Sequence, residues 1–185
     1  MNAMPTPQAS YLYRHFHRIA WLAVLLATCV IVFGAFVRLS NAGLSCPDWP
    51  TCYGKAAWPT HADQVVDHVA TAIRPVEPSK AWREQFHRMI AGLLGVLVLS
   101  LALLATRRRP RGWLHVLGAA TAVAVAIPLY MRGMHVSASA LAVVGETLLL
   151  VGALRWSNVD MARASTLTLA VIIFQALLGM WTVTW

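Results

Sequence analysis

The stretch IAWLAVLLATCVIVFGAFV, residues 19–37, decides the class of the fold. It carries no charge and has about the length that an α-helix needs to cross a hydrocarbon core of roughly 30 Å. The whole chain is 58% hydrophobic and 12% charged, whereas soluble domains have about 25% charged residues. Similar runs follow at 86–105, 113–130, 137–154 and 166–185. The sequence therefore predicts an all-α, polytopic transmembrane bundle of about five spans, formed by residues 1–185 as a single membrane domain.

Eight of the 15 Lys and Arg residues lie in three short segments before or between these runs, and they predict the orientation of the chain. By the positive-inside rule, such segments face the cytoplasm, so we expect a cytoplasmic N-terminus and a multi-pass protein of the bacterial inner membrane. The formal charge of +8 is then a topology signal, and nucleic acid is not an expected partner. The residues concerned are Arg14 and Arg18, then Arg107, Arg108, Arg109 and Arg111, and finally Arg155 and Arg163.

Residues 38–85 form a polar segment that we expect to be a long outer loop between the first two spans. It contains Cys46 and Cys52, with glycines and prolines that favour turns, so the two sulfurs can meet. An oxidising outer compartment would keep such a pair joined. A zinc site is the alternative, although two thiolates without further ligands bind zinc poorly. Cys29, in the middle of the first span, is expected to be a small buried hydrophobe.

The sequence Glu84-Gln85-Phe86-His87-Arg88 places three ionisable side chains where the second span begins. Residues i and i+3 of a helix share a face, so Glu84 and His87 are expected to face the same space. A neutral imidazole is a good axial ligand for haem iron, and ionisable residues within membrane helices usually mark a working site. The alternative is that these side chains only anchor the helix end among the lipid headgroups.

Three motifs carry a resemblance to a known family. They are VRLSNAGLSCPDWPTC at 37–52, Glu84-x-x-His87-Arg88, and Gln175-x-x-x-Gly179-x-x-Thr182-Val183. In this order they resemble the N-terminal part of the haem A synthase family. The resemblance implies an oxidoreductase that converts the C8 methyl of haem O to the formyl group of haem A, for cytochrome oxidase assembly.

The resemblance also implies roles for individual residues. His87 matches a ligand of the haem iron, Glu84 matches a carboxylate that activity requires, and Cys46 with Cys52 matches an outer-face cysteine pair. As a base, Glu84 would accept or relay a proton. Arg38 and Arg88 are expected to pair with haem propionates, or else to reach only the membrane interface.

The family's cofactors and partners follow from the same resemblance. Haem O is the substrate, haem A the product, and a resident haem b is expected in a C-terminal half. Membrane lipid, haem O synthase, cytochrome oxidase assembly factors and a second copy of the chain are the expected partners. A non-catalytic haem-binding or assembly subunit remains the alternative function.

Two departures from the family pattern stand out. The pattern continues beyond the Thr-Val helix to a second axial histidine, so the sequence predicts a partial chain. Residues 113–154 resemble an inserted helical hairpin, which carries His135 and Glu146. His135 is a candidate substitute axial ligand, although a loop histidine beside Arg132 is more often solvated. A carboxylate at the depth of Glu146 costs several kcal/mol unless protonated or paired, which favours a proton-relay or packing role.

Overall fold

The computed structural model describes residues 7–65, 75–107, 109–156 and 160–184. The α-helices of this part are α1 (Pro7–Leu39), α2 (Pro78–Thr106), α3 (Gly112–Met131), α4 (His135–Leu154) and α5 (Met161–Thr184), with a short 3-10 helix η1 (Ala62–Gln64) in the first loop. Each of the 5 α-helices contains a segment long and apolar enough to cross a membrane. The predicted all-α polytopic bundle is confirmed.

Helices α1 and α2 extend well beyond the apolar runs that predicted them. Helix α2 begins at Pro78 rather than Phe86, and a proline suits the first turn because its missing N–H would have no partner there. Hydropathy detects the part of a helix that lies in lipid, whereas backbone hydrogen bonds continue through polar residues. Glu84, predicted to lie in the loop, is therefore inside α2. Trp185, the predicted end of the last span, is outside the described residues.

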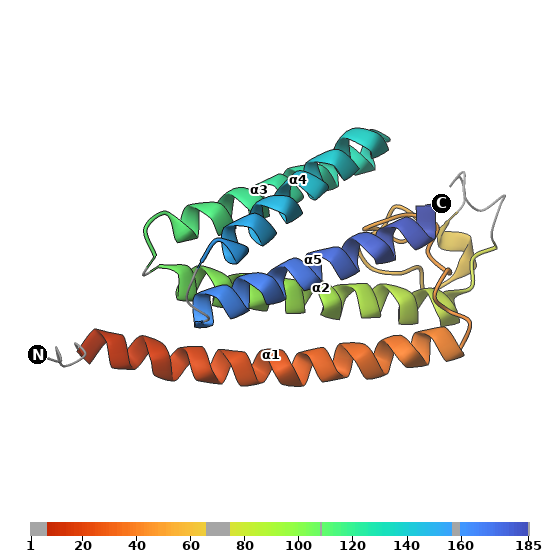
Figure 1. Cartoon of the computed structure of the whole chain (residues 1–185). Helices are drawn as coiled ribbons and strands as arrows, with labels where there is room; N and C mark the ends of the chain where they lie inside the picture. The colour runs from red at the N-terminus through yellow and green to blue at the C-terminus, as the bar shows by residue number, and fades with distance from the viewer. Residues whose placement is uncertain (1–6, 66–74, 108, 157–159, 185) are drawn as a thin grey trace, which may run out of the picture.

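Helix α2 lies at the centre of the bundle (Figure 1). It contacts α1, α3 and α5, while α3 and α4 form a closely packed hairpin and α4 also packs on α5. Helices that are neighbours in the sequence therefore also pack on one another. The hairpin lies on the opposite side of α2 and α5 from α1. We call the end that carries residues 40–65 the loop end, and the end that carries the α2–α3 connection at 107–111 the arginine end.

Large apolar side chains cover the outside of the bundle. On α1, Trp21, Leu25, Ile31 and Val32 are each more than half exposed, which would be unfavourable in water but suits a lipid solvent. The chain is a multi-pass membrane protein. The prediction of a buried Cys29 was wrong: its thiol is exposed on α1. A weakly polar thiol is tolerated there because the surroundings of a membrane helix are apolar.

The α3–α4 hairpin is held together by small residues. A Cβ atom added to Gly145 would lie 3.0 Å from the Ala119 carbonyl oxygen and 3.3 Å from the Ala122 Cβ, so the two backbones are in close contact. Such close approach drives helix association in lipid, where burial of apolar surface contributes little. The neighbouring Glu146 is half-buried, and its Oε2 has no hydrogen-bond partner among the described residues. Its role as a proton relay stays a prediction.

An ion pair closes the arginine end. Arg109 Nη2 lies 2.7 Å from Asp160 Oδ2, and the guanidinium also stacks over Trp156 at 4.7 Å from the ring centroid. Slight burial alone would raise the pKa of Asp160. The backbone N–H of Arg163 and the hydrogen bond and charge of Arg109 together hold that pKa below its ordinary value. The pair therefore links the α2–α3 connection to the start of α5.

Gly145→Ala is expected to destabilise the hairpin by about 1–2 kcal/mol, because the new methyl meets backbone that cannot rotate away. Gly118→Ala on α3 is the control, since a Cβ there meets nothing within 4 Å. The control should be neutral, or gain up to about 1 kcal/mol from helix propensity. Thermal unfolding of the two variants in detergent measures the difference. Equal midpoints would contradict the close packing of α3 on α4.

Candidate functional site

The loop that follows α1 folds around the carboxylate of Asp48. Its oxygens accept the backbone N–H groups of Tyr53, at 2.6 Å, and Gly54, at 2.8 Å, and also the hydroxyl of Thr51. Tyr53 and Gly54 both have positive φ angles, of 53° and 73°. A short acidic side chain that binds nearby amides stabilises such turns. Asp48 therefore organises the turn between the two cysteines.

Cys46 and Cys52 form a disulfide that closes this turn. Both cysteines are fully buried, and they pack against Tyr53 and against Ala81 in the first turn of α2. The disulfide that the family resemblance implied is thus present. The closed ring is small and rigid, and it rests directly on the start of α2.

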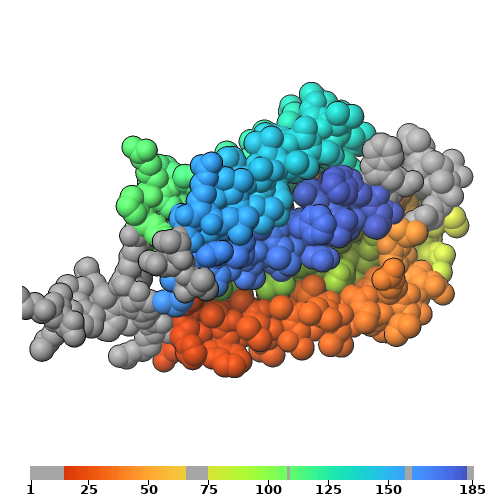
Figure 2. Space-filling view, in the orientation of Figure 1, coloured from red at the N-terminus to blue at the C-terminus, as the bar shows by residue number. Residues whose placement is uncertain are grey.

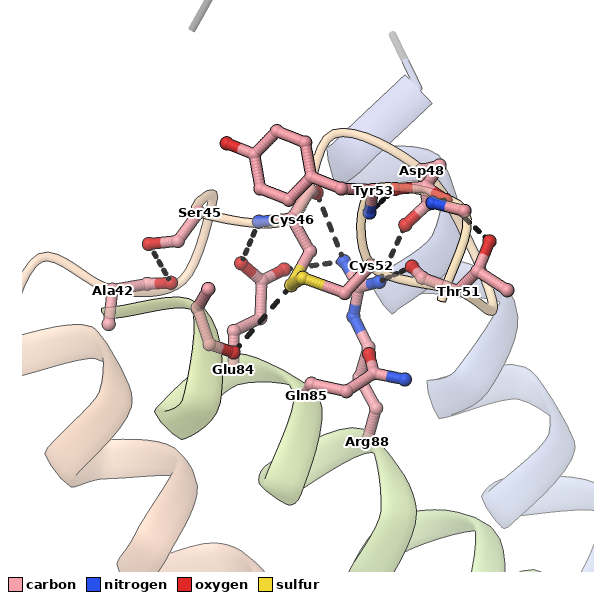
Figure 3. The surroundings of a disulfide bond; sticks show 12 residues. Ala42, Ser45, Cys46, Asp48, Thr51, Cys52, Tyr53, Glu84, Gln85 and Arg88 are labelled. Carbon is pink, nitrogen blue, oxygen red and sulfur yellow. Dashed lines mark hydrogen bonds and ion pairs between the residues drawn. A yellow bond between two sulfur atoms is a disulfide. The ribbon is translucent and has the colours of Figure 1, made fainter. Parts of the chain in front are cut away.

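Glu84 attaches the ring to α2. Its side chain is almost fully buried, its Oε2 accepts the backbone N–H of Cys46 at 2.7 Å, and its Oε1 forms an ion pair with Arg88 (Figure 3). A buried ion pair is stable only when further hydrogen bonds satisfy the remaining charge. The Cys46 N–H meets that need for the carboxylate.

Arg88 and Gln85 complete the attachment. Arg88 Nη1 donates to the carbonyl oxygens of Asp48, at 2.6 Å, and Thr51, at 3.0 Å, while Nη2 lies 3.4 Å from the Cys46 carbonyl oxygen. The buried Gln85 amide donates to two further loop carbonyls, of Pro50 at 3.2 Å and Ala56 at 2.8 Å. We refer to Glu84, Gln85 and Arg88 as the loop anchor.

His87 has different neighbours from Glu84, so the expected shared space does not form. Its ring stacks near that of Phe33 on α1, with centroids 6.4 Å apart and planes at 23°. A Cβ on Gly34 would lie 2.8 Å from His87 Cε1, so only glycine leaves room for the imidazole. The carboxylate of Glu84 binds the Cys46 N–H and Arg88, while the imidazole of His87 packs on α1.

The His87 Nδ1 atom is buried and has no hydrogen-bond partner among the described residues. An unpaired buried polar atom costs free energy. A hydrogen bond to an ordered water would remove that cost. Within the described residues no group of three or more His, Cys, Asp or Glu side chains could hold a metal ion. Axial ligation of a haem uses a single imidazole, and that role of His87 stays a prediction.

The other predicted site residues are more scattered. Arg38 is exposed at the end of α1 and has no ion pair within the described part of the chain, so its guanidinium is available to a ligand. Both terminal nitrogens of Arg88 are already engaged by the loop. Roles for either arginine at haem propionates stay predictions.

His135 packs on a different helix from His87. It is exposed at the start of α4, and its ring packs edge-on against Tyr130 at 4.6 Å between centroids. This hairpin lies across α2 and α5 from α1, on which His87 packs (Figure 1). The geometry gives no support to a shared iron.

Sequence reasoning did not single out Gly34, Asp48 or Gln85. Gly34 is the one glycine in the first span, which is a signal of close packing. Asp48 lies between the cysteines and beside a proline, which is a turn signal. For Gln85 the sequence offers no comparable signal.

The family model described as COX15-CtaA, cytochrome oxidase assembly protein, matches residues 17–185. The chain belongs to this family. The Heme A synthase of Shewanella oneidensis is 46% identical over 87 residues, which cover 44% of this chain and 26% of the relative. The chain thus spans about a quarter of the length of that curated relative. No solved structure gives a significant match.

Arg88→Ala is expected to release the loop. It leaves Glu84 buried without its counter-ion and the loop carbonyls without donors, at a cost of about 3–5 kcal/mol. Trypsin cleavage after Lys55 in the detergent-purified chain should then accelerate. Arg83→Ala is the matched control, because within the described residues Arg83 stacks over Phe36 and Trp82, and such stacking contributes about 0.5–1 kcal/mol. Wild-type cleavage rates in both variants would show that Arg88 does not hold the loop.

Proposed function

We propose that the chain forms the haem-O-binding part of a haem A synthase, which oxidises the C8 methyl of haem O to a formyl group. The family match over residues 17–185 and the Heme A synthase relative support this reading. The proposed setting is the bacterial inner membrane with the loop end outside, as the arginines at 107–111 suggest. Haem O synthase would supply the substrate, and cytochrome oxidase would receive the product.

The observation that carries the proposal is the imidazole of His87. It is half-buried, its Nδ1 is unpaired, and Gly34 and Phe33 give it a close-fitting apolar wall. An imidazole held against an apolar wall would suit axial ligation of a haem iron. Arg38, exposed at the same end of the bundle, offers a charge for a propionate.

The proposed reaction converts the methyl group and one water molecule to the formyl group, with the loss of four electrons and four protons. The electrons must pass to an acceptor outside the described residues, and the protons need a base. Glu84 is three residues from His87 on α2, and each of its carboxylate oxygens keeps a free lone pair beyond its present partner. In this proposal Glu84 accepts the protons one at a time and passes each on to water at the loop end.

A second candidate function is a haem-binding or assembly subunit that does not oxidise its ligand. The specific observation in its favour is the engagement of Glu84 by Arg88 and the Cys46 N–H, because this arrangement already gives the carboxylate a structural role.

Substitutions at His87 and Glu84 test the proposal and separate the two candidates. Full-length chain is incubated with haem O and a redox mediator that accepts electrons, its Soret band is recorded, and the extracted haem is analysed by chromatography. His87→Ala should abolish the Soret band, since it removes the axial ligand. Glu84→Gln should keep the Soret band but lose formyl product by at least about a hundredfold, the usual contribution of a general base.

Glu77→Gln is the control, because Glu77 pairs with Lys80 at the exposed start of the same helix. It should behave as wild type. A wild-type chain that binds haem but never oxidises it, with an indifferent Glu84→Gln variant, would support the second candidate. A chain that binds no haem, or whose Soret band survives His87→Ala, would overturn the proposal.

A further inference from the structure

An open groove runs along α2 between α1 and α5, which flank α2 on either side. It has a volume of about 290 Å³. The space-filling view shows α2 in green between α1 in orange and α5 in blue (Figure 2). The groove lies in the half of the bundle nearer the arginine end, because its floor is formed by α2 residues from Leu94 to Leu101.

The lining of the groove is apolar in effect. Apart from Ser165 and Thr168 on α5, the lining residues are apolar, and the two hydroxyls are satisfied by their own helix. Ser165 donates to the Met161 carbonyl at 2.6 Å, and Thr168 donates to the Ala164 carbonyl at 2.9 Å. A ligand in this groove would therefore meet no polar group that needs a partner.

The face of α2 that forms the groove floor continues to His87. Residues seven apart lie on the same face of a helix, after about two turns, so His87 continues the line of the groove residues Leu94 and Leu101. At a rise of about 1.5 Å per residue, Leu94 lies roughly 10 Å and Leu101 roughly 21 Å below His87 along α2. The imidazole is thus at the upper end of the face that forms the groove floor.

The groove residues of α1 and α5 show the same seven-residue spacing as those of α2. On α1 the groove residues Ala20 and Ala27 continue, after another seven residues, to Gly34, which contacts the His87 ring. On α5 the groove residues Met161 and Thr168 continue to Gln175, which is exposed. The contact between Gly34 and His87 confirms that the two lines meet at one level.

Resting on the proposed function, we infer that this groove binds the farnesyl chain of haem O, below a porphyrin held at His87. Haem O carries this isoprenoid chain where haem b has a vinyl group. A volume of about 290 Å³ is at the small end of ligand pockets, at about 300–1,000 Å³, and suits a single chain rather than a macrocycle. The groove begins about 10 Å below His87, where a chain attached to the edge of the porphyrin would arrive.

The physical basis for selectivity is packing rather than hydrophobic transfer, since lipid tails are as apolar as the groove. Small alanine side chains on α1 leave the space that a branched chain fills. The covalent link to the porphyrin holds the chain beside the groove, which lowers the entropy cost of its binding. This chain would distinguish haem O from haem b at a site where the imidazole cannot.

The test fills the groove from two different helices. Ala27→Phe on α1 and Ala164→Phe on α5 both change groove residues, whereas Ala124→Phe on α3 changes an exposed residue away from it. Each full-length variant, in nanodiscs of phosphatidylcholine, is titrated with haem O and with haem b, and the Soret band reports binding. Wild type and Ala124→Phe should prefer haem O by about tenfold or more, which corresponds to about 1.4 kcal/mol.

Both groove variants should bind haem O and haem b equally, with the affinity for haem b unchanged from wild type. The unchanged haem b affinity shows that the variants are folded. Equal binding of the two haems by wild type, as expected if a lipid acyl chain occupies the groove, would overturn the inference and leave the proposed function intact. So would a haem O preference that survives both groove substitutions. If wild type binds neither haem, the proposed function itself fails, and the inference fails with it.

Discussion

The rest of the loop end depends on one buried carboxylate, that of Glu84, which accepts the Cys46 N–H and pairs with Arg88. Taking an ion pair out of water costs several kcal/mol per ion unless hydrogen bonds satisfy both partners. The loop provides them: its carbonyl groups accept from Arg88, and its Cys46 amide donates to Glu84. The first turns of α2 and the disulfide loop therefore stabilise one another.

This arrangement also fixes the surroundings of His87. Because Glu84 and Arg88 turn to the loop, the imidazole between them in sequence packs on α1, where Gly34 makes room for it. Phe33 contacts the rings of Trp82 and Phe86 on α2, so the same helix pair is held by aromatic contacts as well. A rigid loop end and a close α1–α2 contact together give the imidazole one defined position.

The sequence predicted the spans and the cysteine pair, because hydropathy and turn chemistry are local properties. It did not predict that α2 begins at Pro78, since polar residues can continue a helix outside lipid. The i, i+3 spacing places Glu84 and His87 on neighbouring parts of α2, but it does not determine which groups each side chain contacts. The capture of Glu84 depends on the Cys46 amide, 38 residues away in sequence, and the close approach at Gly34 depends on how two helices pack.

Amide hydrogen exchange at Cys46, measured on the full-length chain, tests the central claim most directly. The account predicts that this amide, 2.7 Å from the buried Glu84 carboxylate, exchanges far more slowly than the exposed Gly43 nearby, and that Glu84→Ala brings the two rates together. Fast exchange at Cys46 in the wild-type chain, or protection that survives Glu84→Ala, would show that Glu84 does not hold the loop to α2.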